Sequence, residues 1–580
     1  MTIRYDRVLG ASARPVGAES GYPVPGPQNV TSEESATAAF FASSCAWQDI
    51  VSQDFDVIVV GTGATAVAFV DQALKNNPNT RVLMLERGPF WLPEHFQNLP
   101  MPFMATMSSP PTTYPWARTR KMATEGPQFF QAGMIPVFGG RTSYWSAWCP
   151  TPTPDLMRDW PEELIAVTQK PGFWDRARAF LHVQDMNTVQ NGVYGGLQDQ
   201  LDARLTANLG MIENAQSAVP APIAVGVPDW TTTSFHKFSV VGALLSLGAR
   251  QQALAAQGKG SALTLVDRCV VNRLLHDDEG LVIAIETSRG VVNVGGAKVV
   301  LGLGAIPPAT LLQTSFGARL PNAGGRYTGH FMSHVTARVR RDAYADLKPL
   351  EIGASYIAGQ DPNSKLQFHV QMSAFAESDP VGQAVTAYHN LPDAAAAPSL
   401  GQLLGSEDYV VFVCATLGEV GPNPESWVRP AAVAPDPAAS VKLQLTLGPD
   451  EQALWDVLDE ATWQALAAAT TAPGGEPPAM EYWVDGPGGV GGGWQSAQPG
   501  PADIRQTIIV HEASMVWMGA DPATSVTGLD YRPHGVQNVY VTGGGLFPTS
   551  GSWNPTLTMC GLAQDLADRL CPAPQAARCG

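Results

Sequence analysis

A glycine-rich turn near residue 61 is the first place where residue types and spacing could do chemistry. It reads GTGATA over residues 61–66 and follows a short β-branched run at residues 56–60. Glycine at the first position permits a tight turn, and glycine at the third lets the backbone approach a pyrophosphate at the N-terminus of the next helix. The turn therefore predicts a dinucleotide site with these contacts: Gly61, Gly63, Ala64 and Thr65.

An acidic residue at a fixed distance from this turn supports the same prediction. Residues 64–75 are typical of a helix and residues 81–85 of a second apolar strand, which ends in Glu86, 25 residues after Gly61. A carboxylate at this place accepts hydrogen bonds from ribose hydroxyls and would repel a 2′-phosphate, which disfavours NADP. Arg87 follows directly and is a further candidate contact. The pattern alone does not separate NAD from FAD, and a plain βα turn remains an alternative.

The C-terminal part of the sequence favours FAD. Residues 538–570 combine a strand (539–542), a triple glycine, a loop, and a helix (557–570) opened by Asn554 and Pro555. Proline fits the first helical turn, where its missing N–H costs nothing. A flavin that is being reduced gains negative charge, which the positive end of such a helix stabilises.

This segment resembles the glucose–methanol–choline (GMC) oxidoreductases, most closely the pyranose-oxidase branch, which ends in a similar glycine–loop–NPTLT–helix. The runs FGGRTSYWSAWCP (138–150) and GGRYTGHFMSHV (324–335) resemble further family segments. The resemblance covers residues 55–150, 235–340 and 505–572, and residues 345–500 only loosely. It implies an α/β fold: a Rossmann-like FAD-binding domain of discontinuous segments and a substrate domain with an antiparallel sheet, similar to p-hydroxybenzoate hydroxylase.

The resemblance also implies which side chains react. His511 in IIVHEASMVWMG matches the family's histidine, and Asn554 matches a position that is His or Asn in different branches. His511 would take the hydroxyl proton while the alcohol carbon gives hydride to flavin N5, and Asn554 would hydrogen-bond the developing alkoxide. The alternatives are a core histidine and a helix N-cap.

The flavin contacts implied by the resemblance lie in three parts of the chain. Tyr144 takes the approximate place of a histidine that links the flavin covalently in many fungal pyranose oxidases, so we expect non-covalent FAD. The predicted contacts are Gly139, Gly140, Thr142, Ser143, Tyr144, Trp145, Val270, Gly544, Asn554, Pro555 and Thr556.

The sequence predicts the substrate less directly than it predicts the cofactor. A sugar, glycoside or similar polyol is the leading prediction from the resembling branch, with oxygen or another acceptor reoxidising the flavin. Aromatic residues near the expected flavin face would also suit an aromatic or natural-product alcohol: Trp145, Trp148, Phe547 and Trp553. Flavin-bound lyase chemistry and a non-catalytic flavoprotein remain alternatives. The sequence does not predict the oligomeric state.

These segments divide the chain into interleaved parts. We expect an N-terminal arm (1–50) and then FAD-binding segments at 51–170, 236–340 and 505–572. Substrate-domain segments are expected at 171–235 and 341–504, and the glycine- and proline-rich stretch 472–502 within them is predicted to be a mobile loop. Within 345–470, strand-like runs alternate with polar and proline-rich connections.

The composition disfavours some classes of binding partner. The 580 residues carry 35 basic and 52 acidic side chains, a net charge of −17, which makes nucleic acid and anionic membranes poor partners. No apolar run reaches the ~18–20 residues that span a bilayer, and the N-terminus lacks a secretory h-region, so we expect a cytoplasmic protein.

The remaining candidate residues are cysteines and histidines. Seven cysteines show no metal-ligand spacing and are expected to be buried or idle thiols, with a Cys571–Cys579 disulfide as an alternative. Four histidines are predicted to serve packing and not a metal: His330, His334, His369 and His389. His236 is expected to have a capping or surface role.

Overall fold

The computed structural model describes residues 47–574, apart from 93, 100–122, 125–129, 132–133, 227–234, 394–398, 432–435, 438–440 and 487–490. The predicted N-terminal arm therefore lies outside the described residues, except where it ends in helix α3 (Trp47–Val51). Cys45 and Cys579 also lie outside them. The other five cysteines are free and buried.

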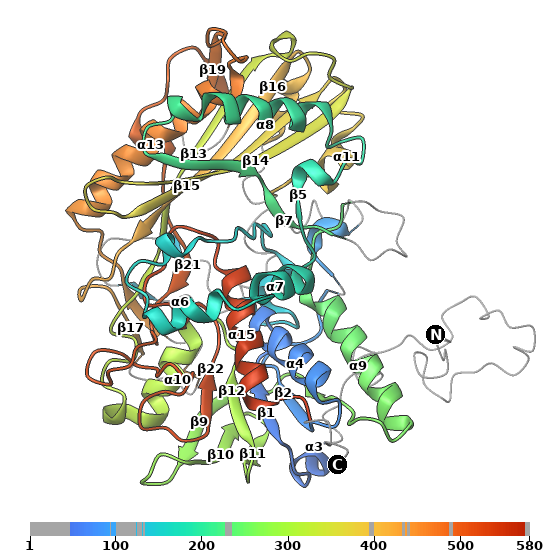
Figure 1. Cartoon of the computed structure of the whole chain (residues 1–580), viewed down its shortest axis with the longest axis vertical. Helices are drawn as coiled ribbons and strands as arrows, with labels where there is room; N and C mark the ends of the chain where they lie inside the picture. The colour runs from blue at the N-terminus through green and yellow to red at the C-terminus, as the bar shows by residue number, and fades with distance from the viewer. Residues whose placement is uncertain are drawn as a thin grey trace, which may run out of the picture.

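A parallel sheet forms the lower half of the molecule in Figure 1. Its strand order is β22-β12-β1-β2-β8, and every neighbouring pair is parallel. The strands β1, β2, β12 and β22 are short apolar runs, as expected where helices cover both faces. They come from three separate stretches of the chain, which confirms an α/β fold assembled from discontinuous segments. The strands are β1 (Val57–Val60), β2 (Val82–Leu85), β8 (Thr264–Val266), β12 (Lys298–Leu301) and β22 (Val539–Val541).

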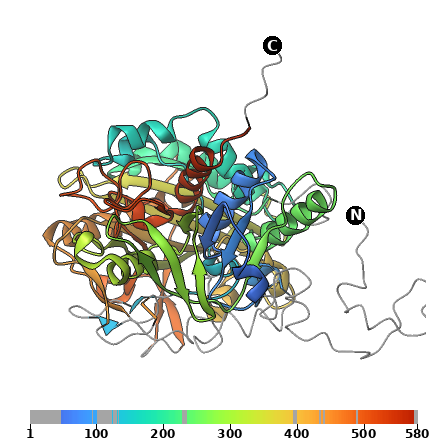
Figure 2. The ribbon, with the colours of Figure 1, turned by 90° about the horizontal axis from the view of Figure 1, so that it is seen from below.

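Two helices from opposite ends of the chain pack together beside this sheet. Helix α4 (Ala64–Asn76) follows the glycine turn, and helix α15 (Thr556–Leu570) follows Asn554 and Pro555. Figures 1 and 2 show α15 lying between α4 and the helices α6 (Glu162–Thr168) and α7 (Phe173–Leu181). The early glycine turn and the late Asn-Pro helix therefore converge, as the sequence predicted.

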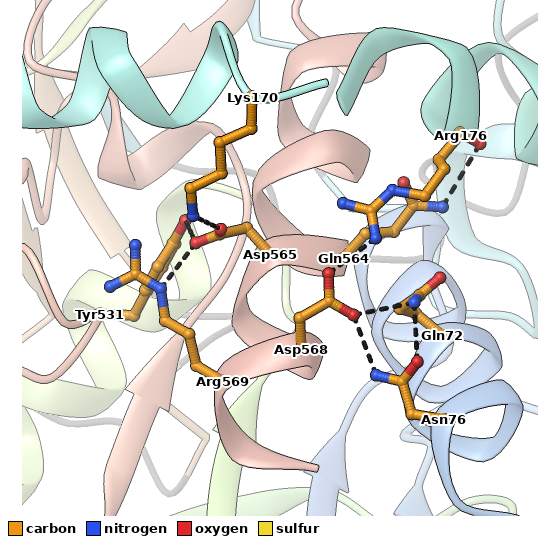
Figure 3. Close-up of polar contacts among 9 residues, drawn as sticks. All are labelled: Gln72, Asn76, Lys170, Arg176, Tyr531, Gln564, Asp565, Asp568 and Arg569. Atoms are coloured by element: carbon orange, nitrogen blue, oxygen red, sulfur yellow. Dashed lines mark hydrogen bonds and ion pairs between the residues drawn. The ribbon is translucent and has the colours of Figure 1, made fainter. Parts of the chain in front are cut away.

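Polar contacts hold α15 in this place, as Figure 3 shows. The Asp568 carboxylate accepts hydrogen bonds from Gln72 and Asn76 of α4, at 2.8 and 2.9 Å, and forms an ion pair with Arg176 of α7 at 2.6 Å. One turn earlier, the Asp565 carboxylate binds three further groups, namely Lys170 at 2.6 Å, Arg569 at 2.7 Å and the Tyr531 hydroxyl at 3.0 Å. One side chain of α15 thus joins two helices that lie about 100 positions apart in sequence.

Removing this charge should lower stability modestly. Burial pushes the pKa of Asp568 upward, but hydrogen bonds from Asn76, Arg176 and Gln72 outweigh it, so the pKa lies below the ordinary 3.8. We expect Asp568→Asn to lower the free energy of unfolding by ~1 kcal/mol, because the group is partly exposed and solvent screens it. Urea unfolding followed by tryptophan fluorescence measures this.

The pH dependence of the same variant has a definite sign. A carboxylate with a depressed folded pKa contributes its stability above the unfolded value of 3.8 and loses it only as the pH falls through the folded pKa. The difference from wild type should therefore persist unchanged from pH 7 to pH 5, and its disappearance at pH 5 would contradict the assignment. Asp530→Asn is the matched control, because Asp530 pairs only with Arg532 nearby on the surface among its described contacts.

An antiparallel sheet forms the upper half of Figure 1. Its order is β20-β19-β13-β16-β15-β14-β6, and off this path β21 pairs with β13 and, in parallel, with the two-residue strand β4 (Phe130–Gln131). Helices α8 (Gly196–Asn208) and α13 (Pro449–Thr470) lie side by side over one face. The strands are β6 (Ala215–Pro220), β13 (Thr328–Arg340), β14 (Leu350–Gln360), β15 (Gln367–Glu377), β16 (Tyr409–Val420), β19 (Met480–Asp485), β20 (Gly492–Gln495) and β21 (Arg505–Ala513).

Smaller elements complete the described fold. The further strands are β3 (Ala123–Thr124), β4 (Phe130–Gln131), β5 (Val183–Asp185), β7 (Pro222–Ala224), β9 (Val271–His276), β10 (Val282–Thr287), β11 (Gly290–Asn293), β17 (Trp427–Pro430) and β18 (Val441–Gln444). The further helices are α9 (Val240–Ala256), α10 (Ile306–Phe316), α11 (Ala384–His389), α12 (Leu400–Leu403) and α14 (Pro501–Ile504). None of the described helices is long and apolar enough to cross a bilayer.

The structure corrects two expectations about the middle of the chain. The stretch 472–502 contains a β-hairpin, because β19 adds to β13 and pairs with β20 around the tryptophans Trp483 and Trp494. The expected FAD-binding segments 236–340 and 505–572 also give their ends, β13 and β21, to the antiparallel sheet. A strand that runs from one domain into the other leaves no turn signal in the sequence at the boundary.

Candidate active site

The glycine turn has the geometry that its sequence predicted. Gly61 has φ +102°, and a Cβ there would lie 2.5 Å from the Gly302 carbonyl oxygen. Gly302 in turn packs on Ala66, where a Cβ on Gly302 would meet the alanine Cβ at 2.6 Å. A Cβ on Gly63, by contrast, would meet no described atom within 4 Å. The turn therefore packs tightly against the sheet at Gly61 and leaves space beside Gly63.

Glu86 braces this turn from the end of β2. Its buried carboxylate accepts hydrogen bonds from the Thr62 hydroxyl at 2.6 Å and from the Gly88 N–H at 2.8 Å. Burial raises the pKa of Glu86, although the hydrogen bonds from Thr62 and Gly88 act against this. The predicted contact with a ribose remains a prediction, since one carboxylate oxygen already holds Thr62 of the turn and the other the Gly88 N–H.

The segment 138–145 lies directly against the turn. Gly139 and Gly140 have φ of +79° and +53°, and a Cβ on Gly140 would lie 3.7 Å from the Gly63 Cα. The Gly139 N–H also faces the Thr62 hydroxyl oxygen at 3.3 Å. Two glycine-rich segments almost 80 positions apart therefore border one space, as the predicted flavin site requires.

The side chains of this segment have different surroundings. The Thr142 hydroxyl donates to the Gly139 carbonyl at 2.7 Å and accepts from the Val240 N–H at 3.2 Å, so it shapes the turn. The Ser143 hydroxyl is buried and lacks a hydrogen-bond partner among the described residues. Tyr144 stacks on Phe96, and burial raises the pKa of its phenol to about 12.

Three other residues that were predicted to contact FAD form ion pairs or hydrogen bonds with other residues of the protein. Arg87 forms an ion pair with Asp436, and the N–H and carbonyl of Val270 both bond to Ser288. The Trp145 indole N–H donates to the Phe238 carbonyl at 2.7 Å.

The other predicted contacts lie at the meeting of the two helix starts. The Thr65 hydroxyl accepts from Thr542 at 3.0 Å, which ties α4 to the end of β22. The Gly544 carbonyl accepts from the Ser514 N–H at 3.2 Å, which ties the triple glycine to the strand that carries His511. Pro555 and Thr556 begin α15, and Ala64 begins α4.

Several features of this space fit a bound FAD. Within the described chain, neither α4 nor α15 has a side-chain N-cap, so their first N–H groups are left for a ligand. The hydroxyls of Ser143, in the segment beside the glycine turn, and of Thr558, in the first turn of α15, are buried without described partners. Uncapped helix starts attract phosphate and other negative charge, and the opening at Gly63 gives the pyrophosphate room.

A β-bulge positions His511. In the pairing of β21 with β13, two residues, His511 and Glu512, lie opposite the single residue Gly329. His511 takes φ +57°, which is strained for a side chain other than glycine, and a Cβ on Gly329 would lie 2.9 Å from the Val510 carbonyl oxygen. Bulges redirect side chains beside active sites.

The second bulge residue ties this strand to the predicted flavin segment. The Glu512 carboxylate is buried and makes a two-pronged ion pair with Arg141, at 2.6 and 2.7 Å. Burial pushes the pKa of Glu512 upward, but Arg141 outweighs it and the pKa lies below its ordinary value. The pair fixes the bulge relative to residues 138–145.

His511 and Asn554 meet in a cluster of polar side chains. The Asn554 amide nitrogen lies 3.5 Å from His511 Nε2, and the Asn554 amide oxygen accepts from Gln371 at 2.9 Å. His511 Nδ1 lies 2.9 Å from His330 Nδ1, and Gln371 also contacts His369 Nε2 at 3.1 Å. The predicted catalytic pair is thus brought together, together with three side chains that the sequence did not single out for catalysis.

Strand register explains why these side chains meet. His330 pairs with Glu419 across β13 and β16, while His369 and Gln371 pair with Leu417 and Ala415 on the same face. The alternate residues on these strands pack against α13 on the other face, for example Phe331 against Trp455 and Ser333 against Asp459. The polar cluster therefore lies on the face turned away from α8 and α13.

Burial sets the charge of this cluster. Burial, then the nearby His369 and Arg141, lower the pKa of His511 to about 3. The pKa values of His330 and His369 also lie well below 6.5, first because of burial. Burial raises the pKa of Glu419 to about 7. The three imidazoles are therefore neutral at physiological pH, and neutral imidazole can accept a proton.

The prediction that His330 and His369 only pack is corrected by these contacts. The alternating spacing of His369 and Gln371 on one strand was the signal that could have found them. His236 pairs with Glu94 at 2.8 Å, half exposed, as expected, and His389 bonds the Leu99 carbonyl. In the described part of the chain, no group of three or more His, Cys, Asp or Glu residues could hold a metal ion.

Comparisons with known proteins agree with this geometry. Residues 422–563 match the family model described as GMC oxidoreductase, and this stretch contains both His511 and Asn554. The crystal structure of pyridoxine 4-oxidase from Mesorbium loti is similar, with a TM-score of 0.54 and 14% identity over 89% of this chain and 99% of that chain. No curated protein matches the sequence significantly. The family-model match over residues 422–563 and the shared fold make the chain similar to the GMC oxidoreductases.

Proposed function

We propose that the protein oxidises a CH–OH group of a sugar, glycoside or similar polyol to a carbonyl, with His511 as the base. The observation that carries this proposal is the meeting of His511 Nε2 and the Asn554 amide in one buried polar cluster. That cluster adjoins the segments that fit FAD, through Arg141, Glu512 and the start of α15.

The residues that would hold FAD come from three stretches. Gly61, Gly63 and the start of α4 would receive the pyrophosphate, and Gly139 and Gly140 with the start of α15 would border the ring system. When bound, FAD supplies an acceptor for the hydride that leaves the alcohol carbon.

The chain's own side chains would handle the proton. The hydroxyl proton passes to Nε2 of neutral His511, and the Asn554 Nδ2 hydrogen bonds the oxygen as negative charge develops on it. An amide cannot take up the proton itself, so Asn554 does not compete with His511. The Arg141–Glu512 ion pair keeps the bulge, and with it the imidazole, in place.

A second substrate class has its own support. Trp148 and Trp553 are fully buried, and the Trp148 ring lies near the Tyr356 ring, which stacks on His369. Such surroundings suit a flat ring, and the similar structure is of an oxidase named for pyridoxine. An aromatic alcohol is therefore the alternative to a polyol.

Anaerobic flavin reduction tests both substrate classes. The purified flavoprotein would be mixed with pyranoses, glycosides, polyols, pyridoxine and benzylic alcohols, and bleaching of the flavin absorbance followed by stopped flow. Fast bleaching by polyols supports the proposal, and fast bleaching by aromatic alcohols alone replaces the substrate class. Conversion of a substrate without bleaching would replace oxidation by lyase chemistry.

We propose in addition that FAD is bound without a covalent link, since Tyr144 takes the place of the linking histidine and its phenol is buried against Phe96. Acid precipitation should therefore release the yellow chromophore into the supernatant. Colour that remains in the washed pellet after precipitation would contradict this.

A further inference from the structure

The contact between His330 and His511 places a condition on where their protons lie. The two Nδ1 atoms are 2.9 Å apart, and the rings are nearly perpendicular, at 76°. A neutral imidazole has one donor and one acceptor nitrogen. One of the two Nδ1 atoms must therefore carry a proton and the other must be bare.

The backbone behind His330 indicates which one is bare. The carbonyls of Gly551 and Ser550 act on the His330 ring, and a carbonyl can only accept a hydrogen bond. Nδ1 of His330 faces His511, and Nε2 is buried without a hydrogen-bond partner among the described residues, so these carbonyls favour a proton on the ring through their dipoles and not through a hydrogen bond. A proton on Nε2 leaves His330 Nδ1 as the acceptor, and the proton of the contact then belongs to His511 Nδ1.

The other end of the cluster leads to the same answer independently. The Ser552 carbonyl acts on His369, whose Nε2 faces the Gln371 amide nitrogen, a donor. The same amide nitrogen donates to the Asn554 oxygen, which turns the Asn554 amide nitrogen toward His511 Nε2. A donor facing Nε2 requires this nitrogen to be bare.

We propose that His330 is a positioning residue that holds His511 in the tautomer with a proton on Nδ1 and a lone pair on Nε2. The consequence for catalysis rests on the proposed function, because only that tautomer presents a base beside Asn554. The polarity of this chain of hydrogen bonds is set by the Gln371 amide nitrogen, which donates to the Asn554 oxygen.

The charges around His330 are compatible with this role. Burial, then the adjacent His511, hold the pKa of His330 well below 6.5, so it stays neutral and can accept. Glu419 is its partner across the strands, and that carboxylate accepts the Gln367 N–H at 3.1 Å. The charge of Arg141 also disfavours protonation of His511.

The tautomer can be measured directly and without any substrate. The holoenzyme would be labelled with ¹⁵N-histidine, and the signals of His511, one of 10 histidines, assigned by their loss in His511→Gln. A protonated Nδ1 and a bare Nε2 are expected, with mixed or reversed tautomers in His330→Leu. A protonated Nε2 in the wild type, or an unchanged His511 in His330→Leu, overturns the proposal.

Paired variants separate positioning from packing. Asparagine can place its amide oxygen near the former Nδ1 and accept the same hydrogen bond, whereas leucine fills space but cannot accept. We expect flavin reduction to fall about 10-fold or more in His330→Leu, with FAD bound and substrate half-saturation unchanged, and to be largely restored in His330→Asn. A leucine variant at least as active as the asparagine variant indicates packing and overturns the proposal. If no alcohol reduces the flavin, the proposed function fails, and the tautomer measurement still decides this inference.

Discussion

Replacing His511 with alanine should slow anaerobic flavin reduction at least ~10²-fold, because general-base catalysis contributes about that much or more. FAD should remain bound, since the nearest segments that fit it are held by other contacts, among them Arg141 with Glu512. The base is available because burial keeps the pKa of His511 near 3 and its imidazole neutral. Stopped-flow absorbance gives the rate, and the visible spectrum gives the FAD content.

A histidine elsewhere serves as the control for this variant. His276 is partly buried and its ring nitrogens face the carbonyls of Asp277 and Ser315, in a different sheet. His276→Ala should leave the rate of flavin reduction within about threefold of wild type, as expected for a change remote from the site. Bleaching at the wild-type rate in His511→Ala would remove His511 from the role of base.

Filling the open side of the glycine turn should abolish tight FAD binding while the fold survives. Gly63 has φ −71° and ψ −177°, which any residue adopts, and a Cβ there meets nothing described within 4 Å. The side chain in Gly63→Val would occupy the space that the pyrophosphate needs. Losing two charge-assisted hydrogen bonds of ~1.5 kcal/mol each weakens binding about 100-fold. Titration of the apoprotein with FAD, followed by flavin fluorescence, measures the change.

The neighbouring glycine is the matched comparison, because there the fold itself should suffer. In Gly61→Ala the new Cβ would lie 2.5 Å from the Gly302 carbonyl oxygen, at φ +102°. We expect a loss of about 1–3 kcal/mol in the free energy of unfolding. Equal FAD affinity in Gly63→Val and wild type would place the nucleotide elsewhere.

Local sequence was sufficient to predict the elements that we propose bind the nucleotide. A β-branched run, two glycines and an apolar helix predicted β1, the turn and α4 to within a residue or two, because each depends on neighbours along the chain. The resemblance at residues 538–570 located β22 and α15 equally well. Their meeting was predicted only through the family resemblance, and the structure confirms it at Asp568, Gln72 and Asn76.

The middle of the chain shows where local pattern fails. Residues 449–470 form the long helix α13, although the surrounding region has strand-like runs and proline-rich connections. The hairpin of β19 and β20 lies in a stretch rich in glycine and proline, and it exists because β19 can join the edge of β13. Pairing with a distant strand outweighs local propensity here.

The sequence by itself predicted the glycine turn, the two chain ends that converge and the proposed reacting pair, because each prediction rests on a short run of neighbouring residues. Only the tertiary structure decided what surrounds His511. The bulge opposite Gly329 turns its ring, and the register of β13, β15 and β16 brings His330, His369 and Gln371 onto one face. Register depends on pairing between strands 30 or more residues apart, so no local pattern contains it.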